Sequence, residues 1–238
     1  MKLSINIDHI ATLRNARGGA EPEPVAGARV VERAGADGIV CHLREDRRHI
    51  RDEDVWRLRK SIRTKLDLEM AATPEIVRIA RKLKPDLVTL VPEKRRELTT
   101  EGGLDVAGLR KSLVTVIEQF HAGKIPVSLF VDPAARQIKA AREIGADMVE
   151  LHTGEYADAR TAGVRRKHLH QIRRMAALGR EIGLGVNAGH GLDFMNIAPV
   201  AEIEEIEEVS IGHAIIVRAV SVGLEQAVRE MVELVKGR

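Results

Sequence analysis

Short apolar runs recur along the chain and alternate with longer segments in which apolar residues repeat with a helical period. The short runs have the length of β-strands, and their alternation with helical segments is typical of βα units around a parallel sheet. We predict eight strands, each followed by at least one helix. Their ranges are 2–7, 37–42, 66–70, 86–91, 125–131, 146–151, 183–188 and 207–212.

Helix-ending residues stand directly before several of these runs. Gly35 and Gly145 each open a Gly-Ala-Asp sequence, and Pro85 stands in a Lys-Pro-Asp sequence, where an apolar run begins. Glycine ends a helix because it adopts the left-handed backbone conformation, and proline because it cannot continue the helix. This punctuation, repeated over the chain, predicts a closed (βα)8 barrel, the TIM-barrel class, as a single domain over residues 1–238.

The same pattern also bears on an alternative fold and on helical segments beyond the minimal barrel. An open doubly wound sheet is the alternative, but that fold has a glycine-rich turn after its first strand, and residues 8–12 contain no glycine. Segments 11–16 and 45–51 resemble short extra helical turns, and 156–182 is long enough for an extended helix. We therefore expect a barrel with short helical additions.

Six of the predicted strands end in histidine, carboxylate, amide or glycine residues, and five of the nine histidines lie at such ends. In a (βα)8 barrel the active site forms at the C-terminal ends of the strands, whereas polar groups at the other end usually serve stability. We expect the six ends to meet in one site. They are Asn6 to His9, Cys41 to Arg44, Leu68 to Met70, Glu150 to Gly154, Asn187 to Gly191 and Ile211 to His213.

Alternation along each strand sorts these residues by face. Cys41 falls on the side opposite to His42, toward the helices, so we do not expect a thiol nucleophile. No lysine occupies a predicted strand end, which argues against a Schiff base on the enzyme. The pairs that share an inward face are Asn6 with Asp8, His42 with Arg44, and Glu150 with His152.

Histidine and glutamate at these ends are candidate general acids and bases. Imidazole titrates near neutral pH, and burial raises the pKa of a glutamate toward neutrality. One buried polar residue alone is as often structural, but several that converge at one rim favour function. We predict this role for His42, Glu69, Glu150 and His190. His42, Glu69, His190 and His213 are also acceptable metal ligands, but no paired spacing supports a metal, and we predict none.

Glycines at the ends of the seventh and eighth runs suggest phosphate binding. Barrels often bind phosphate there through backbone N–H groups, and residues 189–191 and 212–213 provide Gly-His-Gly and Gly-His sequences. Tight turns are the alternative reason for these glycines. Guanidinium groups bind phosphate in a bidentate manner, so the arginines near the rim are further candidates. These are Arg14, Arg17, Arg44, Arg47 and Arg48, of which we favour Arg17 and Arg44, with His49 in the same segment.

Residues 91–103 form a long charged stretch after the fourth run that ends in a glycine pair. Long ordered loops inside compact domains are often lids, so we expect this loop to close over the substrates and exclude water. A solvated surface loop is the alternative. His121, His168 and His170 fall in helical segments, and we expect them in solvent.

Composition narrows the class of protein. Aromatic residues make up only 2% of the chain, so the core must be aliphatic. Basic residues exceed acidic ones by three but are mixed with them, which argues against a nucleic-acid surface. A lone cysteine excludes an internal disulfide, and we find neither a signal peptide nor an apolar run long enough to cross a membrane. We therefore expect a cytoplasmic protein.

Several sequence strings at these positions resemble the pyridoxine 5'-phosphate synthase family. HLREDRRHI at 42–50 and the EKR and TTEGG strings between 93 and 103 are highly specific. The resemblance covers every predicted functional loop. The other matching strings are NIDHIATLRNARG at 6–18, AGADGI at 34–39, LEMA at 68–71, HTGEYADA at 152–159, NAGHGL at 187–192 and IGHAII at 211–216.

This resemblance implies an activity, an assembly and roles for residues. The reaction would condense 1-deoxy-D-xylulose 5-phosphate with 3-amino-2-oxopropyl phosphate into pyridoxine 5'-phosphate, phosphate and water, without a cofactor, in a homo-octamer built as a tetramer of dimers. His42, Glu69 and His190 would be acid/base residues, and Glu150 would stabilise the transition state. The aminoketone phosphate would contact Asn6, Arg17, Gly191, Gly212 and His213, and the deoxyxylulose phosphate would contact Asp8, His9, Arg44, His49 and Thr99.

Without the resemblance, the residues themselves also allow other functions. A metal-dependent phosphosugar aldolase or epimerase, and a non-catalytic phosphometabolite-binding protein, are the alternatives. Val217 departs from the family pattern, because we expect a small residue there, next to the glycine turn after the eighth run. The reaction that the resemblance implies agrees with the residues at the strand ends. Joining two phosphorylated ketones through an amine needs several proton transfers, for which histidine and glutamate are suited. The substrate supplies the amine, so no lysine is needed.

Overall fold

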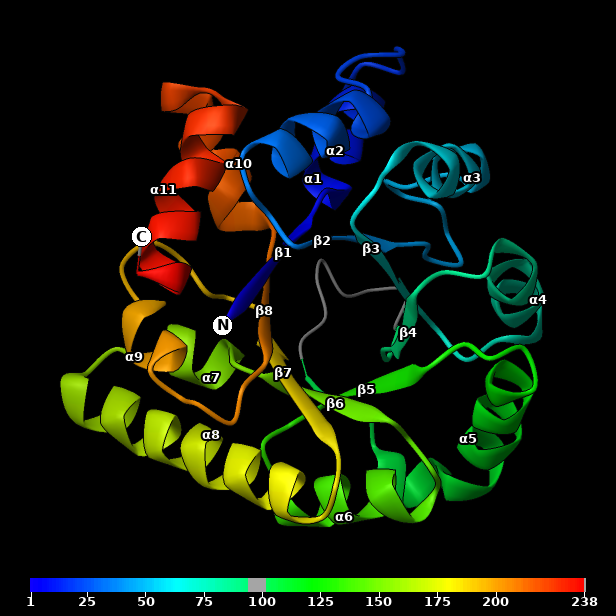
Figure 1. Cartoon of the computed structure of the whole chain (residues 1–238), viewed down its shortest axis with the longest axis vertical. Helices are drawn as coiled ribbons and strands as arrows, with labels where there is room; N and C mark the ends of the chain where they lie inside the picture. Colours follow the sequence, from blue (N-terminus) through cyan, green and yellow to red (C-terminus); the bar gives the residue numbers. More distant parts are fainter. Residues whose placement is uncertain (94–101, 238) are drawn as a thin grey trace.

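Eight parallel strands close into a barrel in the computed structural model, which describes residues 1–93 and 102–237. Each strand pairs with the next along the chain, and β8 pairs with β1, so the sheet has no free edge (Figure 1). The predicted barrel class is confirmed, and the predicted runs match the strands to within two residues. The strands are β1 (Lys2–Asn6), β2 (Gly38–His42), β3 (Lys65–Met70), β4 (Leu87–Leu90), β5 (Val127–Val131), β6 (Met148–His152), β7 (Gly185–Gly189) and β8 (Glu208–Ile211).

Helices surround the barrel on all sides (Figure 1). Capping residues mark some of their ends: Glu23 accepts hydrogen bonds from the first turn of α2, and Gly35 and Gly145 have positive φ after α2 and α6. The helices are α1 (Asp8–Ala16), α2 (Pro24–Arg33), α3 (Asp52–Ser61), α4 (Pro74–Leu83), α5 (Val106–His121), α6 (Ala135–Glu143), α7 (Gly154–Ala157), α8 (Ala162–Glu181), α9 (Ala198–Ala201), α10 (His213–Val222) and α11 (Leu224–Lys236).

Three predicted helical additions differ from the structure. The turn expected at 11–16 belongs to α1, which already begins at Asp8. Segment 45–51 contains a turn closed by the Arg47 N–H and the Arg44 carbonyl at 3.1 Å, but no helix, so that prediction is wrong. The helix expected over 156–182 is divided into α7 and α8, because the Thr161 side chain accepts the Val164 N–H and starts a new helix.

The two faces of the barrel wall differ in polarity. Outward residues such as Leu3, Ile39 and Leu68 are fully buried aliphatic groups that pack against the helices. Many inward positions are polar: Asp67 accepts a hydrogen bond from Thr89, and Lys65 pairs with Glu208 across the interior at 2.5 Å. The apolar core therefore lies between the strands and the surrounding helices. The space inside the barrel contains polar and charged side chains. Among the described residues, no helix combines the length and apolar character needed to cross a membrane.

Candidate active site

A cavity of about 680 Å³ opens at the C-terminal ends of the strands. Its wall takes residues from β1 and α1, β2, β3, β6 and the turns after β7 and β8. The cavity therefore brings together strand ends that are far apart in the sequence. The predicted site residues that line it are Asn6, Asp8, His9, His42, Arg44, His49, Glu69, Glu150, His190, Gly191, Gly212 and His213.

Two predicted binding residues are not placed in this cavity. Arg17 is exposed, because it follows the last residue of α1 where the chain runs to the surface. Thr99, and the part of the expected lid between 94 and 101, lie outside the described residues. Cys41 is buried on the helix-facing side, where burial and nearby acidic groups raise the pKa of its thiol well above the usual value.

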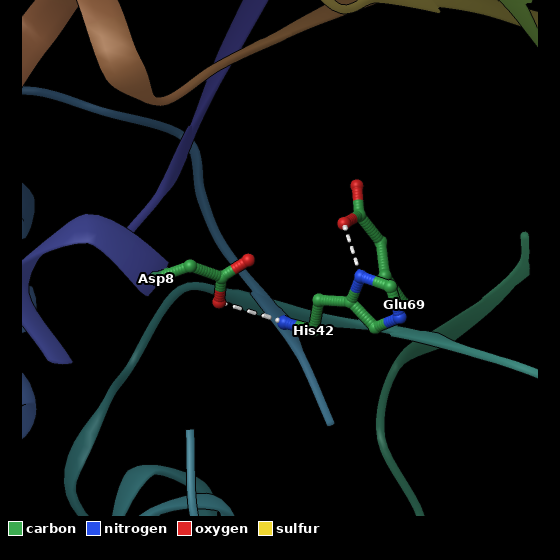
Figure 2. Close-up of side chains that lie close together, drawn as sticks. All are labelled: Asp8, His42 and Glu69. Carbon is green, nitrogen blue, oxygen red and sulfur yellow. Dashed lines mark hydrogen bonds and ion pairs between the residues drawn. The ribbon is translucent and has the colours of Figure 1, made fainter. Parts of the chain in front are cut away.

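Asp8, His42 and Glu69 form the centre of the site (Figure 2). Asp8 lies at the start of α1, and its carboxylate accepts the backbone N–H of His42 at 2.9 Å. The Asn6 side chain donates to Asp8 at 2.9 Å and to Glu69 at 3.4 Å. The His42 ring approaches Glu69, with Nδ1 and Oε2 3.9 Å apart. This contact places an imidazole and a carboxyl group where they can act on one substrate.

Glu93 fixes the other side of the His42 ring. Its Oε1 lies 2.8 Å from His42 Nε2, and its carboxylate also accepts the backbone N–H groups of Glu45 and Ala71. Burial opposes the charge on Glu93, but the contacts with His42 and the Glu45 N–H lower its pKa. Sequence reasoning missed this residue, although its position directly after the fourth run was a signal. His42 is therefore oriented between two acidic side chains.

The same three residues are the candidate metal ligands. One donor atom from each of Asp8, His42 and Glu69 lies within 4.8 Å of the others. Of the ligands considered from the sequence, His190 and His213 are not in this group. Burial and the charges of Glu150, Asp8 and Asp67 raise the pKa of Glu69 well above its ordinary value. A carboxyl with a raised pKa can hold the proton that an acid/base role needs, whereas binding a metal ion would require the loss of that proton.

Glu150 is a second buried acid in the cavity wall. Burial and the charges of Asp67 and Glu208 raise its pKa to about 8. Glu150 therefore carries a proton at neutral pH and can donate a hydrogen bond or the proton itself. Gly189, the last residue of β7, leaves room for this side chain, because a Cβ there would lie 2.1 Å from the Glu150 carboxyl oxygen.

His190 can accept a proton, whereas the buried acids can donate one. Burial, with a contribution from His152, lowers its pKa to about 4, so the ring is neutral at neutral pH and can accept a proton. Its φ of 77° lies in the left-handed region, which is unfavourable for a residue with a side chain. Thr153 Oγ1 donates to the carbonyls of Gly189 and His190 at 2.8 and 2.6 Å and holds this conformation.

Groups that can bind anions lie around the acids and bases. The turn at Gly212 leads into α10, whose N-terminus begins at His213. Arg44, Arg48 and His49 line the cavity from the segment after β2, and Arg44 is buried. Burial lowers the pKa of His49 below its ordinary value. The cavity thus has anion-binding groups on two segments, the turn after β8 and the segment after β2.

The remaining candidates have structural contacts or lie in solvent. Arg14 is buried outside the cavity lining and forms a bidentate pair with Asp54 at 2.7 and 2.9 Å. Arg47 pairs with acidic side chains of α3 and α4. His121 and His170 are exposed as predicted, whereas His168 is half-buried.

Comparison with known proteins gives the chain its family. The family described as pyridoxal phosphate biosynthesis protein PdxJ matches residues 3–237. A pyridoxine 5'-phosphate synthase of Pelodictyon phaeoclathratiforme is 59% identical over 236 residues, which are 99% of this chain and 100% of the relative. A pyridoxine 5'-phosphate synthase of Geobacter metallireducens is 56% identical over 235 residues, or 99% and 98% of the two chains.

Solved structures with lower identity support the fold alone. Thiamine phosphate pyrophosphorylase from Pyrococcus furiosus has a TM-score of 0.64 at 17% identity and covers 99% of this chain and 96% of its own. Phosphoribosyl anthranilate isomerase from Thermus thermophilus has a TM-score of 0.62 at 13% identity, with 100% and 99% coverage. By the match over residues 3–237 and by relatives more than half identical over nearly its whole length, this chain belongs to the PdxJ family of pyridoxine 5'-phosphate synthases.

Proposed function

We propose that this chain condenses 1-deoxy-D-xylulose 5-phosphate with 3-amino-2-oxopropyl phosphate to form pyridoxine 5'-phosphate, phosphate and water, a step of vitamin B6 biosynthesis. One observation carries the proposal: a single cavity combines buried acids, a neutral histidine and donors for two anionic groups. None of the described residues that line this cavity is a lysine. This agrees with a condensation in which the aminoketone substrate supplies the amine.

The proposed roles follow the protonation states of the side chains. His42 and His190 accept and return protons, and Glu69 acts with His42 as an acid/base residue. Glu150 donates a hydrogen bond to charge that develops on oxygen in the transition state, since its raised pKa keeps it protonated. Successive dehydrations need such groups on more than one side of the substrate, and the cavity provides them from β2, β3, β6 and β7.

Two adjoining sets of binding groups are proposed, since the ring centroids of His9 and His213, one from each set, lie 5.0 Å apart. Asn6, Gly191, Gly212 and His213 would hold the aminoketone phosphate, and the N-terminus of α10 favours an anion there. Asp8, His9, Arg44 and His49 would hold the deoxyxylulose phosphate. The assignments of Arg17 to the first substrate and Thr99 to the second rest on the family resemblance alone.

The proposed activity is tested with the purified chain and the two substrates, with product measured by absorbance and phosphate release. His42→Asn removes the imidazole and should reduce kcat by about 100-fold or more, while both substrates still bind. His121→Asn is a matched control, because His121 also contacts a carboxylate at 2.8 Å but lies on α5 and is exposed. Turnover of His42→Asn within a few-fold of the wild type would contradict the role of His42.

A metal-dependent phosphosugar aldolase or epimerase is the second candidate, because Asp8, His42 and Glu69 meet within ligand distance of one another. It requires stoichiometric metal in the purified protein and loss of activity on chelation. Synthase activity that survives chelation excludes it. Product formation of any kind excludes a non-catalytic phosphometabolite-binding protein.

We further propose a single-domain enzyme of the transferase class that works in the cytoplasm as a homo-octamer, a tetramer of dimers, with no metal, cofactor, nucleic-acid or membrane partner. The apolar face of α10 supports assembly, since Val217 and Val220 are 56% and 83% exposed. A second copy of the chain is the proposed occupant of this face. Light scattering should give eight subunits for the wild type and fewer for Val220→Asp; a wild-type monomer would contradict the assembly.

A further inference from the structure

His152 lies beside the cavity without lining it. It ends β6, is 7% exposed, and its ring centroid lies 5.1 Å from that of His190 at an interplanar angle of 62°. Phe130 contacts both rings, at 5.2 Å from His152 and 6.4 Å from His190. Edge-to-face contacts of this kind restrict the orientation of each ring. The His190 ring therefore packs against two buried rings, those of His152 and Phe130.

Asp132 fixes the orientation of His152. Its Oδ1 lies 3.0 Å from His152 Nδ1 and also accepts the Gly103 N–H at 2.9 Å. The hydrogen bond with His152 lowers the pKa of Asp132, so its carboxylate stays charged and the facing Nδ1 carries a proton. The opposite ring nitrogen lies against Gly154, where a Cβ would be only 2.5 Å from Nε2. The ring thus has a defined orientation with contacts on both sides.

The backbone next to His152 holds the backbone of His190. Thr153 Oγ1 donates to the carbonyls of Gly189 and His190, and its N–H donates to the Gly189 carbonyl at 2.9 Å. These bonds stabilise the left-handed conformation of His190. The end of β6 therefore determines both the backbone and the ring position of this residue.

We propose that Asp132 and His152 are positioning residues for His190, with Asp132 fixing the His152 ring and that ring holding the His190 imidazole at the cavity wall. The inference rests on the proposed acid/base role of His190. The titratable groups that act on His190 in the described structure are His152 and Asp158. Burial first, and then the proximity of His152, lower the pKa of His190, so this arrangement also favours a neutral His190 ring at neutral pH.

Asp132→Asn is the test, with Asp147→Asn as a matched control. Asp147 makes the same two kinds of bond, to the ring of His121 and to the Val127 N–H, but at the opposite end of β6. Asp132→Asn should lower kcat by about tenfold while KM for both substrates changes by less than about twofold, because positioning affects the reacting geometry more than binding. Asp147→Asn should leave both constants unchanged.

A second measurement does not depend on activity. The rate at which diethyl pyrocarbonate modifies His190, followed by mass spectrometry of its peptide, reports the neutral fraction of the ring. This rate should be nearly equal at pH 5 and pH 7 in the wild type and in Asp147→Asn, and should fall at pH 5 in Asp132→Asn. His152→Phe, which keeps a ring but loses the bond to Asp132, should behave like Asp132→Asn.

The outcomes separate the two proposals. If Asp132→Asn matches Asp147→Asn both in kcat and in the modification of His190, the positioning role is wrong. If the wild type forms no product but the modification rates differ as expected, the proposed activity fails while the coupling between Asp132, His152 and His190 stands. Equal loss of kcat in Asp132→Asn and Asp147→Asn would indicate a general loss of structure and would also contradict the positioning role.

Discussion

Glu69 and Glu150 are buried next to other acidic groups, and this environment determines their chemistry. Burial acts first on both carboxyls, and the charge of Asp67 adds to it in each case. Each group therefore favours its protonated form at a pH where an exposed glutamate is charged. His190 is affected in the opposite sense, because burial favours its neutral form. The cavity thus places proton donors and a proton acceptor together at neutral pH.

A pH profile of kcat tests the state of Glu150. Its pKa of about 8 means that the carboxyl is protonated below this pH and loses its proton above it. We expect kcat to fall above about pH 8 in the wild type. Glu150→Gln keeps a hydrogen-bond donor that does not titrate, so it should retain measurable activity and lose this alkaline decline. Glu207→Gln, an exposed change on the surface, is the control, and an unchanged decline in Glu150→Gln would contradict the assignment.

Among the elements, the positions of the strands could be predicted from the local sequence pattern more completely than the structure of the loops. The runs that became β1 to β8 were predictable because a buried parallel strand leaves a local signature of apolar residues between helix-ending residues. Asn6 and His42 could be assigned to the inward face by alternation along their strands, whereas Asp8 lies at the start of α1, where strand alternation no longer applies. Their meeting in one cavity followed from barrel closure, which places all the strand ends at one rim.

Contacts between distant segments were not predictable in this way. The partner of Arg14 is Asp54, 40 residues away, and the partner of His42 Nε2 is Glu93, 51 residues away. A guanidinium after the first strand looks the same in sequence whether it binds an anion or a buried carboxylate. Arg14 was therefore considered as an anion ligand, whereas the structure uses it to join α1 to α3.

The pair of Arg14 and Asp54 allows a prediction about the contact between these elements. Both side chains are almost fully buried, and Arg14 also donates to the His49 carbonyl at 3.0 Å. Removing one partner leaves a buried charge, so Arg14→Met or Asp54→Leu should lower the free energy of unfolding by about 3 to 5 kcal/mol. The double variant should cost clearly less than the sum of the two. Urea unfolding measures all three, and additive losses would contradict a direct buried pair.

In the whole molecule, the apolar layer between strands and helices is separate from the charged side chains inside the barrel. Lys65 reaches from β3 to Glu208 on β8, and small residues on the strands between them leave room for its side chain. A Cβ on Gly38 would lie 2.4 Å from Ser4 Oγ and 3.3 Å from Lys65 Cε. The usual barrel interior consists of branched aliphatic side chains. Here, the acids below the cavity supply the charges that raise the pKa of Glu150.

This interior should make the stability of the fold depend on pH. The folded-state pKa of Glu150, about 8, exceeds its ordinary value of 4.5, so between these values the folded chain binds more protons than the unfolded chain. The free energy of unfolding then decreases as the pH rises. His190 has the opposite effect, but only below 6.5, because its pKa is lowered from that value to about 4. Above pH 6.5 the effect of His190 is absent, but Glu69, whose pKa is also raised well above its ordinary value by burial, acts in the same direction as Glu150. Glu150→Gln is therefore needed to isolate the contribution of Glu150.

Urea unfolding at pH 6.5 and pH 8.5 measures this contribution. We expect the wild type to lose about 1 to 2 kcal/mol across this interval through Glu150, since one extra bound proton changes the stability by about 1.4 kcal/mol per pH unit. Glu150→Gln removes the titrating group and should show a smaller loss, whereas Glu207→Gln should match the wild type. An equal loss in all three proteins would mean that the Glu150 carboxyl is already ionised at pH 6.5, and the proposed proton donor in the cavity would then be absent.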